Sequence, residues 1–413
     1  MVMFYVIRVN IVYIYFAMYC MEFFGSFLRK VSADGYVYFD LLEKIFPLLL
    51  VYPFLMVLRN DSQGMLRKAV LAYTVYLFYG AFITFSQGNQ EVVFYQLYHE
   101  LKFILMIVPA MFYFADSLIK EKVIAVFKII LVFSFFVIMV RIFDASLYEI
   151  LFSNGGHHEK GFIFGGQIDR YVGVFWHPSQ LGIFALFSFV VLLSVKSDYL
   201  EYRKWFFLCF ILILLSVQRL EIFLLFVVVI SFYLVKWLNL AASVSKMVDS
   251  SYLLLGVVGV VLLILYPGQL IDWLLVDPSP RSIMYAESVH AFIGSSFLGA
   301  GWGEVGSHSA ADLTDAYIYT DIGDTWWWDE GKYLYDTYWP HIIGETGIIG
   351  IFLLVLCIYY LARSQNTFEL KIAWAVFVAT SLMSSNMQSI FYLLVISMTL
   401  LVIRNVNDIN KCE

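Results

Sequence analysis

The sequence predicts an all-α integral membrane protein, a polytopic bundle of about twelve transmembrane helices. Hydrophobic residues make up 62% of the 413 residues, and charged residues make up only 14%. An ordinary soluble domain carries about a quarter charged residues. The apolar residues also come in successive runs, several of them near the roughly 20 residues that cross a bilayer as a helix, with short polar segments between them.

The spans are placed from these runs, in chain order. The run at 9–28 has no small-residue cleavage pattern, so we expect a retained first span. The segment SVQRLE (216–221) joins two short runs, and one long helix is the alternative there. The turn SSNMQS (384–389) would place Asn386 and Gln388 at membrane depth. The expected spans lie near 9–28, 40–58, 69–85, 101–119, 123–143, 179–195, 205–217, 221–236, 251–266, 340–362, 372–385 and 388–403.

The distribution of Lys and Arg sets the expected orientation. These residues fall mainly in the loops on one side of the predicted bundle, and cytoplasmic loops are enriched in them. We therefore expect a single integral domain (1–413) with both termini in the cytoplasm. The loops 144–178 and 267–339 then face outward, and the second is long enough to be functional.

The cysteines and the net charge exclude several classes of site. The four cysteines show no CxxC or Cys/His spacing, so we expect neither disulfides nor a metal. The net charge of -6 reflects acidic residues in one late loop, which does not indicate nucleic acid as a partner.

Arginines on the outer side are informative, because the cytoplasmic preference of cations works against them. Arg170, Arg219 and Arg281 are the three candidates. Guanidinium groups bind phosphate oxygens in bidentate fashion and keep their charge, so three that meet would suit a lipid pyrophosphate. The alternative for each is to snorkel to headgroups or to pair with an acid such as Asp169 or Glu221.

Two stretches of the long loop have distinctive compositions. FLGAGWGEVGSH (297–308) is dense in glycine, and a structural turn is the favoured interpretation because no βαβ unit surrounds it. Farther on, three consecutive tryptophans lie among acidic residues. Aromatic platforms beside carboxylates suit sugars, whereas the alternative is an interfacial aromatic belt. The candidate sugar-binding residues are Asp324, Trp326, Trp327 and Trp328.

Three histidines have simpler interpretations. His157 and His158 are adjacent in a glycine-flanked loop and lack a partner at metal-ligand spacing, so a loop tip is favoured. His177 precedes Pro178 and marks the start of a span, because the residue before proline resists helix. Contact with substrate is the second interpretation for His177.

The stretch DTYWPHIIGETGIIG (336–350) carries polar residues into an apolar run. Proline is tolerated in the first helical turn, so Thr337 is a reasonable N-cap and Asp336 lies just outside the helix, at its outer mouth. His341 and Glu345 are four residues apart and share a helix face. Glu345 would lie about a turn below the membrane surface. A carboxylate there has either a functional role or a partner such as His341 or an arginine.

Glycines recur along the same helix. Gly344, Gly347 and Gly350 form a small-residue strip, and such strips let another helix pack closely in membranes.

From about residue 165 onward, the chain resembles the O-antigen polymerase (Wzy) family, within the superfamily that also contains the O-antigen ligases. The resemblance rests on RYVGVFWHPSQLG, SVQR, FLGAGWG and DTYWPHIIGETGIIG in this order. In the ligases, a histidine stands nine residues before the glutamate of the E-x-G element. Here Asp336 stands there relative to Glu345, as is common in the polymerases, and His341 keeps the ligase interpretation open.

The resemblance implies a many-helix bundle with a large periplasmic loop in the bacterial inner membrane. It also implies a glycosyltransferase that joins repeat units carried on undecaprenyl pyrophosphate, with a chain-length-regulating membrane protein as a further candidate partner. Asp336, with His341, would accept the proton of the attacking hydroxyl, and the three arginines would stabilise the pyrophosphate. Glu345 and His177 would support them, and we expect no metal or cofactor.

Two alternatives remain. One is a ligase that transfers finished polymer to lipid A core. The other is a flippase or secondary transporter of lipid-linked oligosaccharides, which would share the many spans and the buried polar residues but should lack so elaborate an outer loop.

Overall fold

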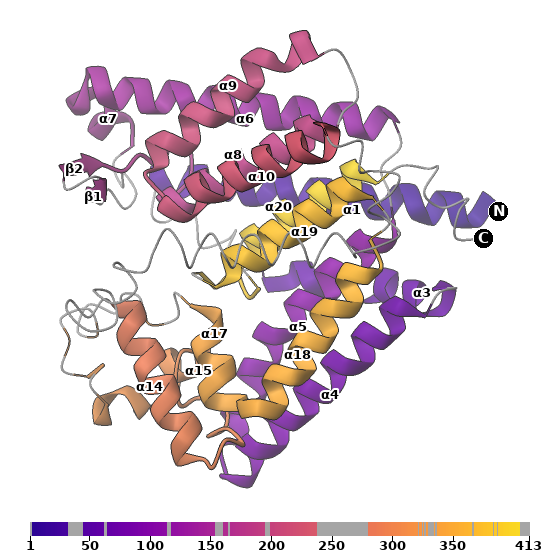
Figure 1. Ribbon diagram of the computed structural model, residues 1–413, viewed down its shortest axis with the longest axis vertical. Coiled ribbons are helices and arrows are strands. Elements are labelled where there is room, and N and C mark those ends of the chain that lie inside the picture. Colours follow the sequence, from indigo (N-terminus) through magenta and orange to yellow (C-terminus); the bar gives the residue numbers. More distant parts are fainter. Residues whose placement is uncertain are drawn as a thin grey trace.

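A computed structural model gives the architecture in Figure 1. It describes residues 2–31, 44–61, 64–113, 117–152, 160–163, 166–194, 199–237, 280–320, 322–323, 325, 328, 334, 337–365, 367–382, 384–385 and 387–404. Apart from one short hairpin, the regular elements of these ranges are helices.

Most expected spans coincide with a helix. The helices in question are α1 (Val2–Val31), α3 (Val51–Asn60), α4 (Met65–Ser86), α5 (Gln90–Phe112), α6 (Ser117–Phe143), α8 (Pro178–Ser194), α9 (Tyr199–Ser216), α10 (Arg219–Trp237), α18 (Gly347–Arg363), α19 (Phe368–Ser381) and α20 (Ile390–Ile403). The expected span 251–266 lies outside the described residues. The pair joined by SVQRLE is two helices and not one, because the chain turns at Val217, which has a φ of 53°.

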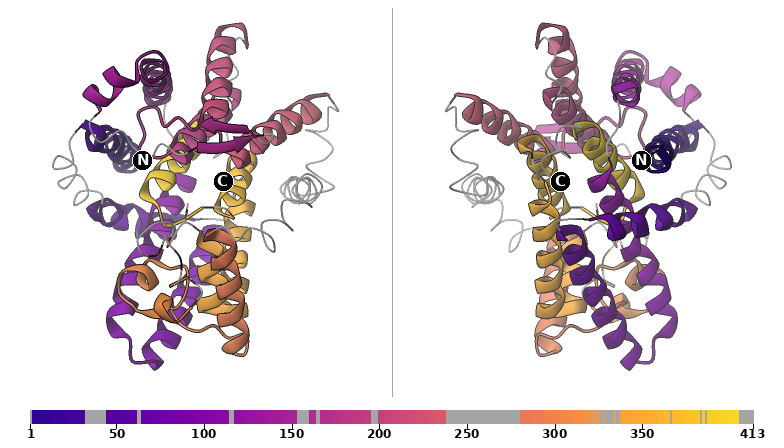
Figure 2. Two further views of the ribbon diagram at one scale, coloured as in Figure 1. Left: turned by 90° about the vertical axis from the view of Figure 1, so that its left-hand side faces the viewer. Right: turned by 90° about the vertical axis from the view of Figure 1, so that its right-hand side faces the viewer.

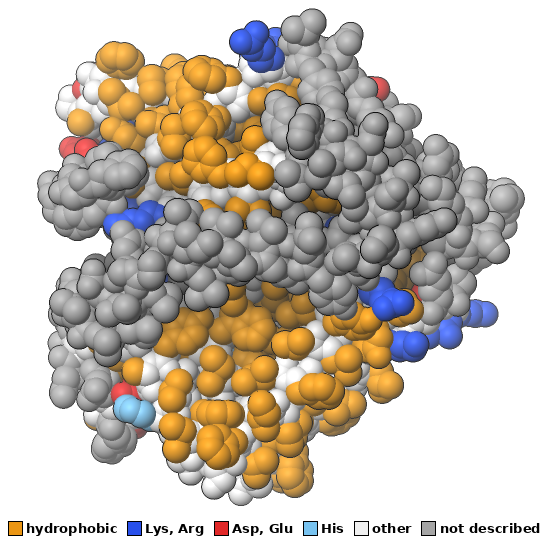
Figure 3. Space-filling view, viewed as in Figure 1, with side chains coloured by type: hydrophobic (Ala, Val, Ile, Leu, Met, Phe, Trp, Pro, Cys, Tyr) orange, Lys and Arg blue, Asp and Glu red, His pale blue; other side chains and the backbone are white. Residues whose placement is uncertain are grey.

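Length and composition mark several helices as able to cross a membrane. Within the described ranges, four helical segments qualify, namely Met65–Ser86, Gln90–Phe112, Ile119–Phe143 and Tyr338–Arg363. Large apolar side chains also cover the outside of the bundle: Phe78 and Phe82 are each 73% exposed, and Phe143 is 83% exposed. In Figure 3, hydrophobic side chains cover most of the described surface of one face, and the few charged ones lie mainly near its edges. Such a surface suits a lipid environment.

The two expected outer loops contain secondary structure of their own. The first holds α7 (Ala145–Leu151) and an antiparallel hairpin of β1 (Lys160–Ile163) and β2 (Gly166–Asp169), in which Lys160 pairs with Asp169. The second holds α14 (Pro280–Gly294), α15 (His308–Asp312) and the 3-10 turn η2 (Ala316–Tyr319). In Figure 1 these elements lie toward the left-hand side of the molecule, whereas α1 begins at the right-hand side.

Helix α14 connects the second loop to the bundle. It packs against α17 (Tyr338–His341) and the π-helical turn η3 (Ile342–Thr346), which lead into α18. Both views of Figure 2 place α14 beside this helix. The described part of the predicted junction, 337–350, therefore packs against a helix of the 267–339 segment.

Helix α5 begins at Gln90, well before the span expected from residue 101. The helical turns before residue 101 contain polar residues, including Gln96 and Glu100. For this reason the sequence of this stretch resembles a loop between two spans. Both side chains are fully buried at 0% exposure, so the helix continues because its polar groups find partners in the interior.

Trp302 anchors the glycine-rich loop on α4. Its side chain is 0% exposed, and its backbone N–H donates to Thr84 Oγ1 at 2.7 Å. A Cβ atom built on Gly80 would lie 2.5 Å from the Trp302 ring. Glycine at position 80 thus provides the space that lets the loop lie directly on the helix.

We expect Gly80→Val to destabilise the protein by about 1 to 3 kcal/mol or more, the usual effect of overpacking a filled core. The thermal unfolding temperature in detergent should fall. Gly294→Val is the control, because a Cβ atom at position 294 meets nothing within 4 Å. An equal fall in both variants would show that the contact between Trp302 and Gly80 is not what stabilises the loop.

Candidate functional site

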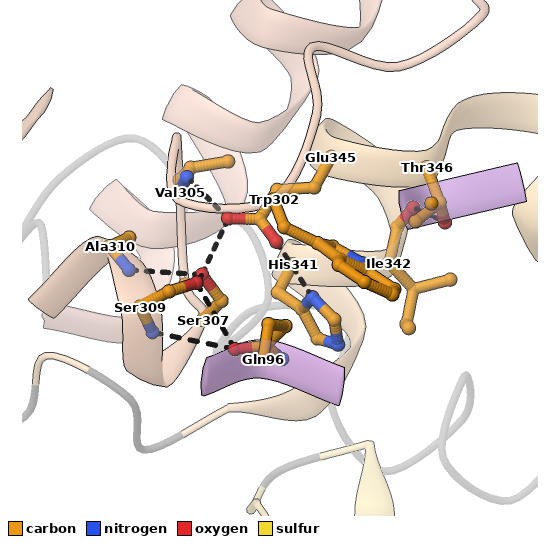
Figure 4. A network of polar contacts seen from close by, with 12 residues as sticks. Gln96, Trp302, Val305, Ser307, Ser309, Ala310, His341, Ile342, Glu345 and Thr346 are labelled. Atoms are coloured by element: carbon orange, nitrogen blue, oxygen red, sulfur yellow. Dashed lines mark hydrogen bonds and ion pairs between the residues drawn. The ribbon is translucent and has the colours of Figure 1, made fainter. Parts of the chain in front are cut away.

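The glycine-rich loop binds the carboxylate of Glu345. Glu345 Oε1 accepts hydrogen bonds from the backbone N–H groups of Gly303, Glu304 and Val305, each at 3.0 Å, and from Ser307 Oγ at 2.6 Å. Successive backbone N–H groups that converge in this way form an anion-binding nest. Gly303 has a φ of 94°, which a side chain would disfavour. The turn expected at 297–308 therefore has a specific partner (Figure 4).

His341 lies between two carboxylates. Its Nδ1 is 3.0 Å from Glu345 Oε2, and its Nε2 is 2.9 Å from Glu100 Oε1. All three side chains are 0% exposed. Ionised carboxylates only accept hydrogen bonds, so a ring with a carboxylate at each nitrogen donates from both and carries a positive charge. The predicted pairing of His341 with Glu345 is present, and the second carboxylate comes from α5.

Glu100 is held from several directions. Its Oε1 accepts from Gln388 Nε2 at 2.7 Å and from Gln96 Nε2 at 3.0 Å. Its Oε2 accepts from Tyr73 at 2.9 Å and from Tyr338 at 3.1 Å. The donors come from α4, α5, α17 and the turn before α20, so one carboxylate joins four segments. We call Glu100, His341 and Glu345, with these donors, the buried network.

The glycine strip lets helix α14 approach closely at Gly344, as expected, and it also receives the glycine-rich loop. A Cβ atom on Gly344 would press on Val305 and would lie 3.1 Å from the Ser288 Cα of α14. A Cβ atom on Gly347 would collide with the backbone at Leu298, and its φ is 61°. In this position beside Gly344 and Gly347, the loop presents its N–H groups to Glu345.

The arginines proposed for pyrophosphate lie around one helix start. Arg219 is the first residue of α10, and Glu221, 4% exposed, lies in the same turn. Arg281 in the first turn of α14 and Arg170 after β2 both act electrostatically on the Glu221 carboxylate. Arg170 and Arg281 thus lie within electrostatic range of Glu221, the acid that the sequence analysis named as an alternative partner for them.

Helix α14 connects the arginines with the buried network. Arg281 lies at its beginning, and Ser288, two turns later, packs against Gly344 beside Glu345. Tyr285, between them, donates to the carbonyl of Leu382 at 2.9 Å. A shift of α14 would therefore move a candidate phosphate ligand relative to the junction.

Two of the other candidate residues have structural contacts. His177 Nδ1 lies 2.7 Å from Ser179 Oγ, which in turn lies 2.7 Å from the Tyr392 hydroxyl. His177 therefore contacts the first turn of α8, as its predicted boundary role requires. Trp328 packs edge-on against Tyr317 at a ring distance of 5.5 Å, within a small core of the outer loop.

The remaining candidates lie outside the described residues. They are Asp336, Asp324, Trp326, Trp327, His157 and His158.

The sequence analysis missed Glu100 and Gln96. Their four-residue spacing on an apolar background is a signal for a shared buried face, but the expected span began only at 101. Gln388 was noticed at membrane depth without a partner, because a contact between residues 288 positions apart leaves no local pattern.

A second histidine cluster lies beside the network, and its groups are not arranged for a metal. The rings of His99 and His308 stack at 4.0 Å, and Lys102 Nζ lies 3.3 Å from His99 Nδ1. Burial, followed by the charges of Lys102 and His341, lowers the pKa of His308 from 6.5 to about 3. In the part of the chain that the structure describes, no three His, Cys, Asp or Glu side chains are grouped to bind a metal ion.

Comparisons with family models, with curated proteins and with solved structures find no match to this chain.

We expect His341→Gln to destabilise the protein by roughly 3 to 5 kcal/mol, because removing one partner leaves buried charges uncompensated. The loss should appear as a lower unfolding temperature of purified protein. His290→Gln is the matched control, since the His290 side chain is 71% exposed. Similar unfolding temperatures for the two variants would contradict a charged His341 in the network.

We expect stability to fall as the pH is lowered below about 6.5, in part through His308. Its pKa is 6.5 in the unfolded chain and about 3 when folded, so the unfolded state binds the proton first and acid favours unfolding. At pH 5.5 the effect should be about 1 kcal/mol. Unfolding temperatures measured between pH 5.5 and 8 should fall less in His308→Asn than in the parent. An equal fall in both would assign the acid sensitivity to other groups.

Proposed function

We propose that this protein is a membrane glycosyltransferase, an O-antigen polymerase that transfers a glycan from undecaprenyl pyrophosphate to another lipid-linked repeat unit. The observation that carries the proposal is that Arg170 and Arg281 both act electrostatically on Glu221, in the first turn of α10 that also holds Arg219. Arginines from distant segments at one place suit a ligand with several phosphate oxygens. The resemblance of four motifs to the polymerase family supports the same assignment.

The arginines act on the leaving group. The hydroxyl oxygen of the acceptor sugar bonds to the anomeric carbon of the donor, and the bond from that carbon to the pyrophosphate oxygen breaks. The electron pair leaves with undecaprenyl pyrophosphate. Guanidinium groups placed where this charge develops stabilise the transition state, an effect that is often the largest in catalysis. Direct displacement inverts the anomeric centre.

Asp336 accepts the proton of the attacking hydroxyl. This role rests on the position of Asp336 in the motif, nine residues before Glu345. His341, the second candidate, has both ring nitrogens engaged by carboxylates and is 0% exposed. We therefore give His341 a positioning role and leave the proton transfer to Asp336.

The membrane arrangement that accompanies this function has twelve spans in the bacterial inner membrane, with both termini in the cytoplasm. The loops 144–178 and 267–339 then lie in the periplasm, where lipid-linked repeat units are joined. A chain-length-regulating membrane protein is the further partner that this activity calls for. The exposed apolar surface of the helices supports the membrane placement.

We expect Asp336→Asn to reduce polymerisation by about 10² to 10⁴-fold, as for loss of a general base. Arg281→Ala should reduce it by roughly 10²-fold, through lost electrostatic stabilisation. The measurement is polymer length on a gel, from cells with equal amounts of protein in the membrane. Arg203→Ala is the control, since Arg203 is an exposed residue of α9, a helix that lies far from α14 in Figure 1.

Two outcomes separate this function from its alternatives. A strain that lacks the gene and still caps its lipid A core with single repeat units lacks a polymerase, whereas loss of a ligase removes the cap altogether. Purified protein in detergent that joins lipid-linked repeat units, with no ion gradient present, catalyses the transfer itself and is not merely a transporter. An unchanged polymer ladder in Asp336→Asn would refute the assignment of the base.

A further inference from the structure

Two groups of the junction bind the same carboxylate. Tyr338 donates to Glu100 Oε2 at 3.1 Å, and His341 lies 2.9 Å from Glu100 Oε1. These two residues are three positions apart, nearly one turn of α17. Two contacts on one side of a helical turn fix both its position and its rotation, which a single contact would not do.

Glu100 is itself immobilised. It lies within α5, and its oxygens also accept from Tyr73 of α4 and from Gln388 before α20. The side chain is 0% exposed, so it cannot exchange these partners for solvent. Glu100 thus fixes the position of the junction relative to the helices of the bundle, and not relative to the 267–339 loop.

The opposite side of the junction is held separately. Glu345 binds the glycine-rich loop through Oε1 and His341 through Oε2. Trp339 Nε1 also donates to Ser381 Oγ of α19 at 3.1 Å. His341 is therefore fixed from both sides, by Glu100 from the bundle and by Glu345 from the loop.

We infer that Glu100 is a positioning residue for the transfer reaction, because it holds the 337–341 turn, which directly follows the proposed base in the sequence. This inference rests on the proposed function, in which Asp336 is the base. Glu100 acts through Tyr338 and His341 and needs no contact with substrate. Small displacements of a catalytic group slow a reaction strongly, because the reacting atoms must approach within a narrow range.

Glu100→Gln is the central test, with purified full-length protein and lipid-linked repeat units as substrate. The glutamine keeps the shape of the side chain and removes the charge that faces His341. We expect kcat to fall at least tenfold while KM stays near the parent value. Glu100→Asp should recover part of the rate, because it restores the charge. Ser397→Ala is the control, since Ser397 is equally buried and joins α20 to α5 through the carbonyl of Met106.

A double variant separates positioning from general destabilisation. If Glu100 acts through Asp336, then Glu100→Gln should slow Asp336→Asn no further. Effects that multiply would overturn the inference, because destabilisation of the fold is independent of the base. Should Glu100→Gln fail to fold, Tyr338→Phe removes one hydrogen bond to Glu100, and we expect a roughly threefold to tenfold lower kcat with unchanged KM.

The outcomes also distinguish the two proposals. An active Asp336→Asn with a slow Glu100→Gln would refute the base and thereby the route through which Glu100 is inferred to act. An inactive Asp336→Asn with a normal Glu100→Gln and a normal Tyr338→Phe would leave the proposed function standing and refute the role of Glu100.

Discussion

The placement of His341 between Glu100 and Glu345 is the interaction on which the other features depend. Three ionisable side chains at 0% exposure are tolerated only because each faces a partner of opposite charge or a hydrogen-bond donor. The network fixes the position of the glycine-rich loop, because the loop N–H groups bind Glu345. It also fixes the packing of α5 against the junction, because Glu100 binds Tyr338 and His341. Its polar residues thus satisfy one another, and the glycine-rich loop supplies the remaining donors to Glu345.

Local spacing was sufficient to predict part of this site. His341 and Glu345 are four residues apart, so their shared face followed from helix geometry alone. The helices themselves followed from apolar runs. Glu100 was missed because its polar neighbours on α5 made the first turns of that helix resemble a loop. The contact of Gln388 with Glu100 could not be read from either residue, because only the packed bundle brings them together.

For the arginines and the aromatic residues too, some features follow from the local sequence and others only from the packing of distant segments. Sidedness singled out Arg170 and Arg281 from many cations, and the fold brings both near Glu221. Glu221 had been named beside Asp169 as a possible partner, and the choice between the two depends on packing that includes α14, a helix expected to be loop. Trp328 was predicted for a sugar platform from composition, and its partly buried ring packs edge-on against Tyr317. Composition alone cannot distinguish a binding surface from a small core.

The contact between Glu100 and Gln388 has a consequence for biogenesis. Ribosomes release the N-terminal part of a chain first, and 288 residues separate these two side chains. While the bundle is growing, Glu100 has only Gln96 and Tyr73 as partners among those described, and His341 arrives much later. Glu100 therefore gains its full set of partners only after the C-terminal helices have been synthesised.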